Sequence, residues 1–291
     1  MDAQAEKAET FRKLHSRRDI LVLPNAWDVP SARVFEDSGF RAVATSSAGL
    51  MVSLGYPDGE EMPLQEFISA IGRIAGVLSI PLSADVVSGY GADPDGVARA
   101  VRRIVEAGAI GVNIEDFEHQ SRRMRTVEKQ LARLKALVKL RDTGPVRFVI
   151  NARTDALRFA RGDDRAKFTE AVRRGEAYRD NGADCIYPMG LVDSGQISEY
   201  VQALKFPVNV MVRRGLPSVS ELKRVGVARV SFGPSASYAA LGLLRRASDE
   251  ILAKGTYEYL LDGAITFDEL NRLAVSKKPR TGEGPFTPSH P

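Results

Sequence analysis

The chain has 291 residues, of which 44% are hydrophobic and 27% are charged, and its formal net charge is +4. These values are ordinary for a globular protein and exclude disorder or low complexity over the whole chain. The length suits either two average domains or one large α/β barrel, which commonly needs about 250 residues.

Simple counts exclude several classes of protein. The single cysteine, Cys185, excludes an intrachain disulfide and a zinc site built of several cysteines. No apolar run approaches the roughly 20 residues that cross a bilayer, and residues 1–10 are polar and partly acidic, unlike a targeting peptide. The basic residues are mostly interleaved with acids. We therefore expect a soluble cytoplasmic protein with no membrane or nucleic-acid partner.

Eight short apolar runs, bounded by Gly, Pro or polar residues, recur along the chain. They occupy residues 20–23, 42–44, 80–82, 110–114, 148–150, 185–187, 208–211 and 228–232. Short continuous apolar runs are typical of strands that are covered on both faces, as in parallel sheets. The sequence therefore predicts eight parallel strands.

Amphipathic segments separate these runs. Apolar residues follow helical spacing over 64–78, 97–105 and 127–138. Asp93 followed by Pro94 is typical of a helix start, and Gly precedes several of the runs, as at a helix end.

This alternation predicts a single (β/α)8 TIM-type barrel over residues 1–275, with an extra N-terminal helix across its bottom, a C-terminal helical extension over 256–275 and a flexible tail over 276–291. The alternative, a two-domain doubly wound protein, would need a break near the middle of the chain, and none is visible.

Polar side chains follow most of the predicted strands, where barrel enzymes place their chemistry. Asp58, Asp85 and Glu115 could converge there, and crowded carboxylates repel one another unless a cation neutralises them. Because only His119 among the three histidines is near this rim, an oxygen-ligand site for Mg²⁺ is favoured over a zinc site. Each acid also has a structural alternative: an ion pair for Asp85, pairing with Arg153 for Glu115, and a loop cap for Asp58.

Other rim residues suit an anionic substrate. Arg153 supplies a guanidinium for a carboxylate or phosphonate, and Ser46, Ser47 and nearby glycines such as Gly49 offer hydroxyl and N–H donors to an oxyanion. Trp27 is a candidate for packing or for substrate contact. Asp116 and Asp155 are expected to be structural, and Cys185 to be a small buried side chain.

The residues named above, in the order in which they occur along the chain, make this sequence resemble the isocitrate lyase/phosphoenolpyruvate mutase superfamily. The similarity runs from Leu23 to Pro234 through the segments "LPNAWDVPSARVFEDSGF", "TSSAG", "LGYPDGE", "SADVVSGYG", "GVNIEDF", "INARTDAL", "ADCIYPMG" and "PVNVM". The resemblance implies a (β/α)8 barrel that uses Mg²⁺, or Mn²⁺, to form or break C–C or C–P bonds in 2-oxo or 2-hydroxy acids through an enolate-like pyruvate species.

The resemblance also implies roles for individual residues. Asp85 would be the direct metal ligand, and Asp58 and Glu115 would hold metal-bound waters. The catalytic set would be Ser46, Ser47 and Arg153, with His119 as a candidate on a closing loop. The substrate-binding set would be Trp27, Ser46, Ser47, Gly49, Asp85, Arg153 and Asn209.

Three departures from the family pattern stand out. Val87 replaces the second carboxylate that usually follows the metal ligand, which would weaken metal binding. The stretch from Phe117 to Met124 lacks the cysteine of the true lyases, which argues against an isocitrate or 2-methylisocitrate lyase. The common glutamate after the sixth strand is absent from the stretch Tyr187 to Gly190.

Three functions remain open at this stage. The favoured one is Mg²⁺-dependent cleavage of a C–C bond in a small 2-oxo or 2-hydroxy dicarboxylate, for instance by decarboxylation. The second is C–P chemistry of the phosphoenolpyruvate mutase or phosphonopyruvate hydrolase type, and the third is a carboxylate-binding barrel that has lost catalysis. The resemblance further implies a homo-oligomer, a dimer or tetramer, with the helix of 235–261 exchanged between neighbours.

Overall fold

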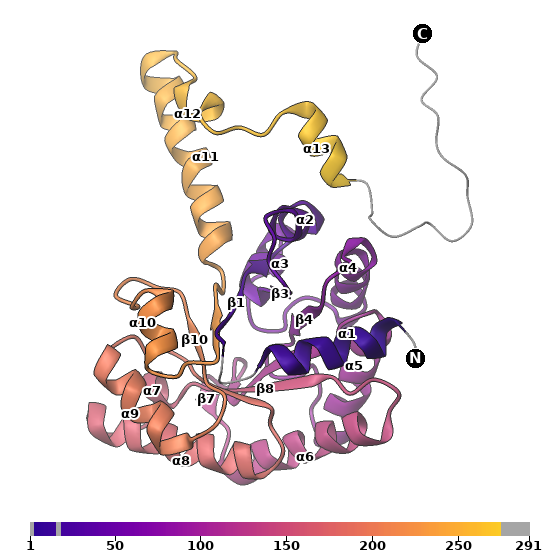
Figure 1. Cartoon of the computed structure of the whole chain (residues 1–291), viewed down its shortest axis with the longest axis vertical. Coiled ribbons are helices and arrows are strands. Elements are labelled where there is room, and N and C mark those ends of the chain that lie inside the picture. The colour runs from indigo at the N-terminus through magenta and orange to yellow at the C-terminus, as the bar shows by residue number, and fades with distance from the viewer. Residues whose placement is uncertain (1–2, 16–18, 275–291) are drawn as a thin grey trace.

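The computed structural model describes residues 3–15 and 19–274, and its centre is a barrel of parallel strands (Figure 1). The first strand is split by Pro24 into β1 (Leu21–Leu23) and β2 (Asn25–Ala26). The others are β3 (Val43–Thr45), β4 (Leu82–Asp85), β5 (Gly111–Glu115), β8 (Val149–Thr154), β9 (Cys185–Pro188), β10 (Asn209–Met211) and β11 (Arg229–Ser231). All eight predicted strands are confirmed.

Parallel pairing runs around the whole barrel. One sheet has the order β2-β3-β4-β5-β8-β9 and the other β1-β11-β10. A parallel bridge between Ile186 and Val208 joins β9 to β10, and β1 continues into β2, so the strand order returns to its start. The predicted single (β/α)8 barrel is confirmed.

Helices follow the strands in the expected alternation. They are α2 (Val29–Asp37), α3 (Ser47–Ser53), α4 (Leu64–Val77), α5 (Pro94–Glu106), α6 (Val127–Thr143), α7 (Ala156–Phe159), α8 (Asp164–Asp180), α9 (Ser194–Leu204) and α10 (Val219–Arg224). At the start of α5, Asp93 accepts a hydrogen bond from Gly96 N, with Pro94 in the first turn. Gly108 and Gly182, just before β5 and β9, have φ of 114° and 93°, the left-handed conformation that ends a helix at low cost.

The N-terminal helix α1 (Ala3–Leu14) covers the bottom of the barrel, as predicted. The Phe11 ring lies against Gly111 at the start of β5, so close that a Cβ there would stand 2.7 Å from the ring. Arg12 pairs with Asp184, just before β9, and donates to the carbonyl of Phe148, just before β8. These contacts close the end of the barrel opposite the site.

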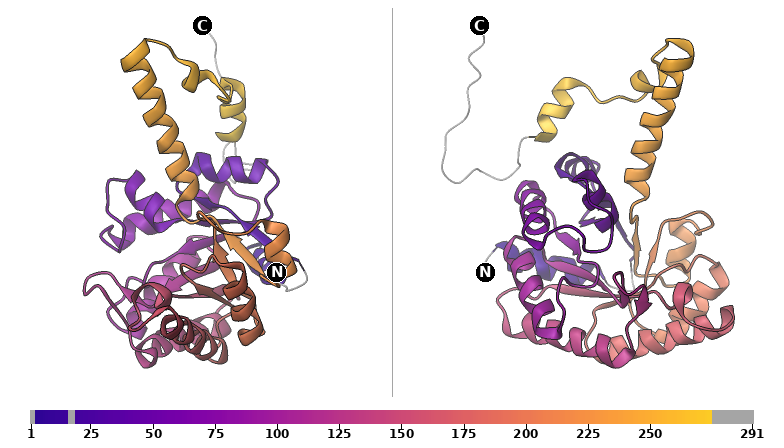
Figure 2. Two further views of the ribbon diagram at one scale, coloured as in Figure 1. Left: turned by 90° about the vertical axis from the view of Figure 1, so that its left-hand side faces the viewer. Right: turned by 180° about the vertical axis from the view of Figure 1, so that it is seen from behind.

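The segment after β11 leaves the barrel. Helix α11 (Ser235–Lys254) stands away from it and carries α12 (Glu258–Leu261) at its far end, and the chain then returns to place α13 (Phe267–Ala274) beside α2 (Figures 1 and 2). The predicted helical extension is therefore present, while residues 276–291, predicted as a tail, lie outside the described residues. None of the described helices is both long and apolar enough to span a bilayer.

Candidate active site

A cavity of about 530 Å³ opens at the C-terminal ends of the strands. The predicted site residues that line it are Ser46, Ser47, Asp58, Asp85, His119, Arg153 and Asn209. Glu115 lies just behind this wall, while Trp27 and Gly49 do not line the cavity. Seven of the ten predicted site residues therefore line the cavity.

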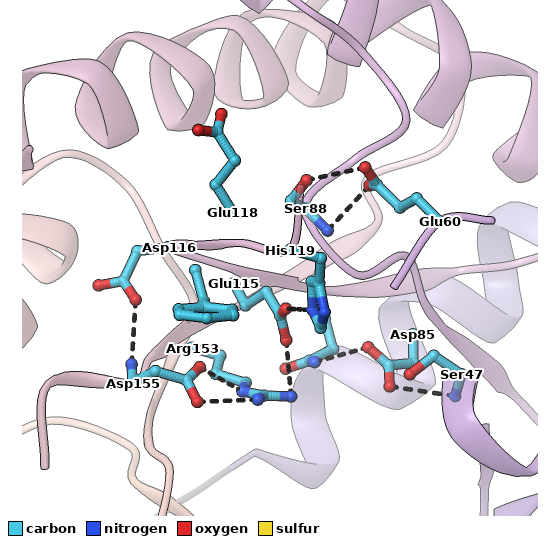
Figure 3. Close-up of polar contacts among 12 residues, drawn as sticks. Ser47, Glu60, Asp85, Ser88, Glu115, Asp116, Glu118, His119, Arg153 and Asp155 are labelled. Carbon is cyan, nitrogen blue, oxygen red and sulfur yellow. Dashed lines mark hydrogen bonds and ion pairs between the residues drawn. The ribbon is translucent and has the colours of Figure 1, made fainter. Parts of the chain in front are cut away.

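Asp85, at the end of β4, is held by neutral donors alone. Its Oδ2 accepts from Ser47 N at 3.2 Å and its Oδ1 from Asn113 Nδ2 at 2.8 Å (Figure 3). Within the part of the chain that the structure describes, no Lys, Arg or His lies within 4.0 Å of this carboxylate. The ion-pair alternative for Asp85 is therefore not found, and its negative charge remains available to the cavity.

A relay of amides supports Asp85 from inside the barrel. Asn151 Nδ2 donates to Asn113 Oδ1 at 2.7 Å, and Asn113 in turn donates to Asp85. Both asparagines were missed as site residues. Their signal was the two-residue period of β strands, which puts Asn113 on the same face as Glu115, and Asn151 on the same face as Arg153.

Asp58 lies in the loop between α3 and α4, near Asp85. Burial raises the pKa of Asp58, the charge of Asp85 raises it further, and a hydrogen bond from Ser47 lowers it. The two carboxylates thus disfavour each other's charge, and a cation between them would remove this cost.

These residues fit a hard divalent cation such as Mg²⁺. The carboxylate oxygens of Asp85 have no cationic partner and can therefore bind a metal ion, and Asp58 adds a second carboxylate nearby. Over residues 3–15 and 19–274, no three His, Cys, Asp or Glu side chains form a ready-made metal site. A cation that keeps most of its waters and needs few protein ligands, as Mg²⁺ does, suits such a site.

Glu115 takes part in a buried ion pair. Its Oε2 lies 2.7 Å from Arg153 Nη1 and its Oε1 lies 2.5 Å from His119 Nε2 (Figure 3). Burial raises the pKa of Glu115, while Arg153 and His119 lower it. The ion pair between Glu115 and Arg153, which the sequence left open as an alternative, is therefore present. A role of Glu115 in holding a metal-bound water stays a prediction.

Arg153 is fixed in place by a second carboxylate. Its Nε and Nη2 donate to the two oxygens of Asp155 at 2.7 and 2.9 Å. Asp116 accepts from Asp155 N at 3.0 Å and binds Arg174 and Tyr178 on its other oxygen, so both aspartates are structural, as expected. Burial alone would lower the pKa of Arg153, but Glu115 and Asp155 raise it well above its usual value. The guanidinium is thus a permanent, oriented charge on the cavity wall.

The stretch that replaces the lyase loop forms a hairpin at the rim. Strands β6 (Phe117–Glu118) and β7 (Arg123–Met124) pair antiparallel, and His119 follows β6. The hydrogen bond that His119 donates to Glu115 raises the pKa of His119, although burial opposes this effect. Gly59 lies against the same ring: a Cβ at this position would stand only 2.7 Å from His119 Nδ1. Its φ of 113° also lies in the left-handed region. Only glycine fits this position.

Two of the predicted donors around α3, the backbone N–H groups of Ser47 and Gly49, are already engaged. Ser46 caps the helix and its Oγ accepts from Gly49 N at 3.2 Å, while Ser47 N is bound to Asp85. Trp27 packs on Gly49, where a Cβ would stand 3.0 Å from Trp27 Cβ. For Trp27 the packing alternative is therefore found, and the Gly49 N–H holds the helix start. The prediction that these two bind substrate finds no support in the cavity wall.

Two of the positions that depart from the family pattern, Val87 and the stretch after β9, can be located in the structure. Val87 is buried in the core with φ of 54°, an uncommon conformation for a β-branched residue. In the stretch Tyr187 to Gly190, which lacks the family glutamate, the sulfur of Met189 accepts a hydrogen bond from Tyr187 Oη at 2.8 Å. The wall also includes residues that were not among the predicted site residues, such as Arg122, Arg158, Phe159, Tyr187, Met189, Arg229 and Tyr238.

Comparison with known proteins identifies relatives along nearly the whole chain. Residues 11–252 match the family model described as phosphoenolpyruvate phosphomutase. The 2-methylisocitrate lyase of Aeropyrum pernix is 31% identical over 272 residues, which cover 90% of this chain and 85% of that protein.

Solved structures agree. A putative lyase/mutase from Burkholderia cenocepacia has a TM-score of 0.86 at 35% identity and covers 93% of this chain and 97% of its own. Oxaloacetate acetylhydrolase in complex with the product oxalate has a TM-score of 0.80 at 27% identity, with 92% and 93% covered.

Proposed function

This chain belongs to the phosphoenolpyruvate phosphomutase family and is an enzyme of the isocitrate lyase/phosphoenolpyruvate mutase superfamily, and we propose that it cleaves a C–C bond in a small 2-oxo or 2-hydroxy dicarboxylate. The observation that carries the proposal is that two different groups line the same cavity. One is Asp85, a carboxylate with no cationic partner, and the other is Arg153, a guanidinium held in place by carboxylates. Relatives named 2-methylisocitrate lyase and oxaloacetate acetylhydrolase support this reaction class.

The geometry supports a separate role for each of these residues. Asp85 and Asp58 would hold the divalent cation, which when bound would stabilise negative charge on the oxygen of an enolate. Arg153, locked by Asp155 and Glu115, would orient a substrate carboxylate without a loss of side-chain entropy at each turnover. The Ser47 side chain, which interacts with Asp58, stands at the same wall.

His119 is our candidate for proton transfer on the rim. Its Nε2 is held by Glu115 and the ring lines the cavity. This arrangement is a base oriented by a buried carboxylate, as proton-transfer catalysis requires. It would stand in for the cysteine that the hairpin lacks.

The direct test is release of pyruvate from 2-oxo-4-carboxylates such as oxaloacetate, with Mg²⁺ or Mn²⁺ present and then removed by chelation. We expect metal-dependent pyruvate release that Arg153→Met abolishes. Arg161→Met is the matched control, because Arg161 is exposed and does not line this cavity. No pyruvate from any such substrate would refute the proposal.

C–P chemistry is the second candidate, favoured by the description of the matched family model. Phosphorus NMR with phosphonopyruvate separates the two reactions, since C–P turnover changes the phosphorus signal. If neither reaction occurs and Mg²⁺ does not bind, while Val87→Asp restores binding, the chain is the carboxylate-binding barrel of our third interpretation.

We also propose that the protein is a homo-oligomer built through α11. Its residues Tyr238, Leu241, Leu244 and Leu252 are more than half exposed, as is Phe267 in α13, although apolar side chains of this size usually find cover. A neighbouring copy that accepts α11 against its own barrel would bury them. Sedimentation at micromolar concentration should give a dimer or tetramer, and a monomer would contradict the proposal.

A further inference from the structure

The cavity reaches down to a buried arginine that no part of the proposed reaction uses. Arg229 begins β11 and is only 2% exposed, yet it lines the cavity together with Ser83. Metal and substrate residues such as Asp85 and Arg153 stand at the strand ends above it. Arg229 therefore forms part of the cavity floor.

The guanidinium has almost no partner. Among the described residues its one hydrogen-bond neighbour is His15, whose Nε2 lies 3.5 Å from Arg229 Nη1. Arg229 Nε is buried without a hydrogen bond, and no carboxylate in residues 3–15 and 19–274 lies within 4.0 Å of the group. Most of its five N–H donors are thus unused.

The groups around Arg229 cannot supply a counter-charge. Burial and the charge of Arg229 lower the pKa of His15 to about 3, and burial raises the pKa of the Cys185 thiol to about 12. Both stay neutral near pH 7. Asp85 is the carboxylate that attracts Arg229, and it does so without forming an ion pair with it.

A second atom at the floor is equally unsatisfied. Ser83 Oγ is buried without a hydrogen bond and lines the same cavity. Buried polar groups nearly always find partners, and a buried charge needs a charge-bearing or strongly polar partner to be tolerated. Water could occupy such a space but brings no negative charge.

We propose that this floor, formed by Arg229 and Ser83 with Asn209 and Ser231 beside them, is an anion subsite that binds one carboxylate of a small dicarboxylate. The planar fork of an arginine matches the two oxygens of a carboxylate. Asn209 and Ser231 line the cavity and form a hydrogen bond with each other across β10 and β11, so their hydroxyl and amide are placed to complete the site. The identity of the ligand as a dicarboxylate rests on the proposed function.

Succinate, which cannot react, is the probe. Its affinity is measured by calorimetry in EDTA, with wild-type protein, Arg229→Met and the exposed control Arg161→Met. We expect Arg229→Met to weaken binding about 10- to 100-fold, the usual worth of a charge-assisted pair, and Arg161→Met to leave it unchanged. Equal affinity in all three proteins would overturn the proposal.

Stability separates a binding role from a structural one. Without ligand, Arg229→Met removes an uncompensated buried charge, so its urea midpoint should equal or exceed that of wild type. If Arg229 served only to hold His15 and α1, the midpoint would fall while succinate affinity stayed the same.

A crystal of wild-type protein soaked in succinate tests the site without any substitution. We expect a carboxylate within hydrogen-bond distance of Arg229, and succinate bound only at the rim beside Arg153 would refute the subsite. Because these measurements use neither metal nor turnover, their failure is distinguishable from failure of the proposed reaction.

Discussion

His15 makes the stability of this protein depend on pH in a calculable way. Its Nδ1 lies 2.8 Å from Phe11 O and its ring packs edge-on against Phe11, at 4.6 Å between centroids. Burial, with a smaller contribution from Arg229, lowers its pKa from 6.5 to about 3. As pH falls, the unfolded chain therefore takes up a proton that the folded chain refuses.

The sign and size follow from proton linkage. The His15 contribution to stability is complete above pH 6.5 and is lost progressively as pH falls toward 3. At pH 5 the unfolded histidine is nearly all protonated and the folded one hardly at all, which costs about 2 kcal/mol of unfolding free energy.

Urea denaturation at pH 7.5 and pH 5 measures this effect. We expect wild type to lose about 2 kcal/mol more than His15→Gln between the two pH values, because glutamine keeps a donor for Phe11 O but does not titrate. The comparison removes the contribution of the carboxylates, which both proteins share. Parallel losses in the two proteins would show that His15 is not held neutral, and would refute the reasoning.

Three further substitutions test the site. Asp85→Asn should weaken Mg²⁺ binding in calorimetry by at least about tenfold, and undiminished binding would place the cation elsewhere. Asp155→Asn should lower kcat about 10- to 100-fold by freeing the Arg153 guanidinium from its two-point support, so a normal kcat would show that Arg153 needs no such support. Gly59→Ala should cost about 1–3 kcal/mol of stability through its positive φ and its contact with His119, and removing the ring with His119→Ala should recover part of that loss in the double variant.

The barrel could be predicted because its signals are local. The eight apolar runs, the cap at Asp93 and the glycines before β5 and β9 each report on a few neighbouring residues. The location of Asp85 and Arg153 at the cavity was accessible for the same reason, since each lies at the C-terminal end of a strand. Position along a parallel strand fixes the end of the barrel at which a side chain lies.

Contacts between strands were beyond the same reasoning. Whether Glu115 faces a metal or Arg153 depends on side-chain rotamers and on the register Glu115↔Arg153 between β5 and β8, and neither has a local signal. Gly49 was predicted to offer its N–H to substrate, but that group is used by Ser46 at the helix start. A hydrogen bond within one turn of helix thus occupies the group that was predicted to bind substrate.

Arg229 shows where an available signal was missed. It interrupts the apolar run 228–232, and the two-residue period puts it on the same face of β11 as Ser231. A charged residue inside an otherwise apolar barrel strand points either to an ion pair or to a ligand. No carboxylate partner stands beside it among the described residues, so the second alternative gains weight.

The charges of the cavity differ between its rim and its floor, and this difference bears on what can bind. At the rim the carboxylates of Asp58 and Asp85 line the cavity together with the guanidinium of Arg153, whereas among the described residues the charge at the floor is that of Arg229 alone. Burial lowers the pKa of Arg229, and the charge of Asp85 is one of the influences that oppose this lowering, so Asp85 at the rim and Arg229 at the floor attract each other. A cation held at Asp85 would cancel this attraction and leave the floor uncompensated, so metal binding and anion binding should strengthen each other. Succinate affinity should accordingly rise when Mg²⁺ is added to wild type, and this gain should vanish in Arg229→Met.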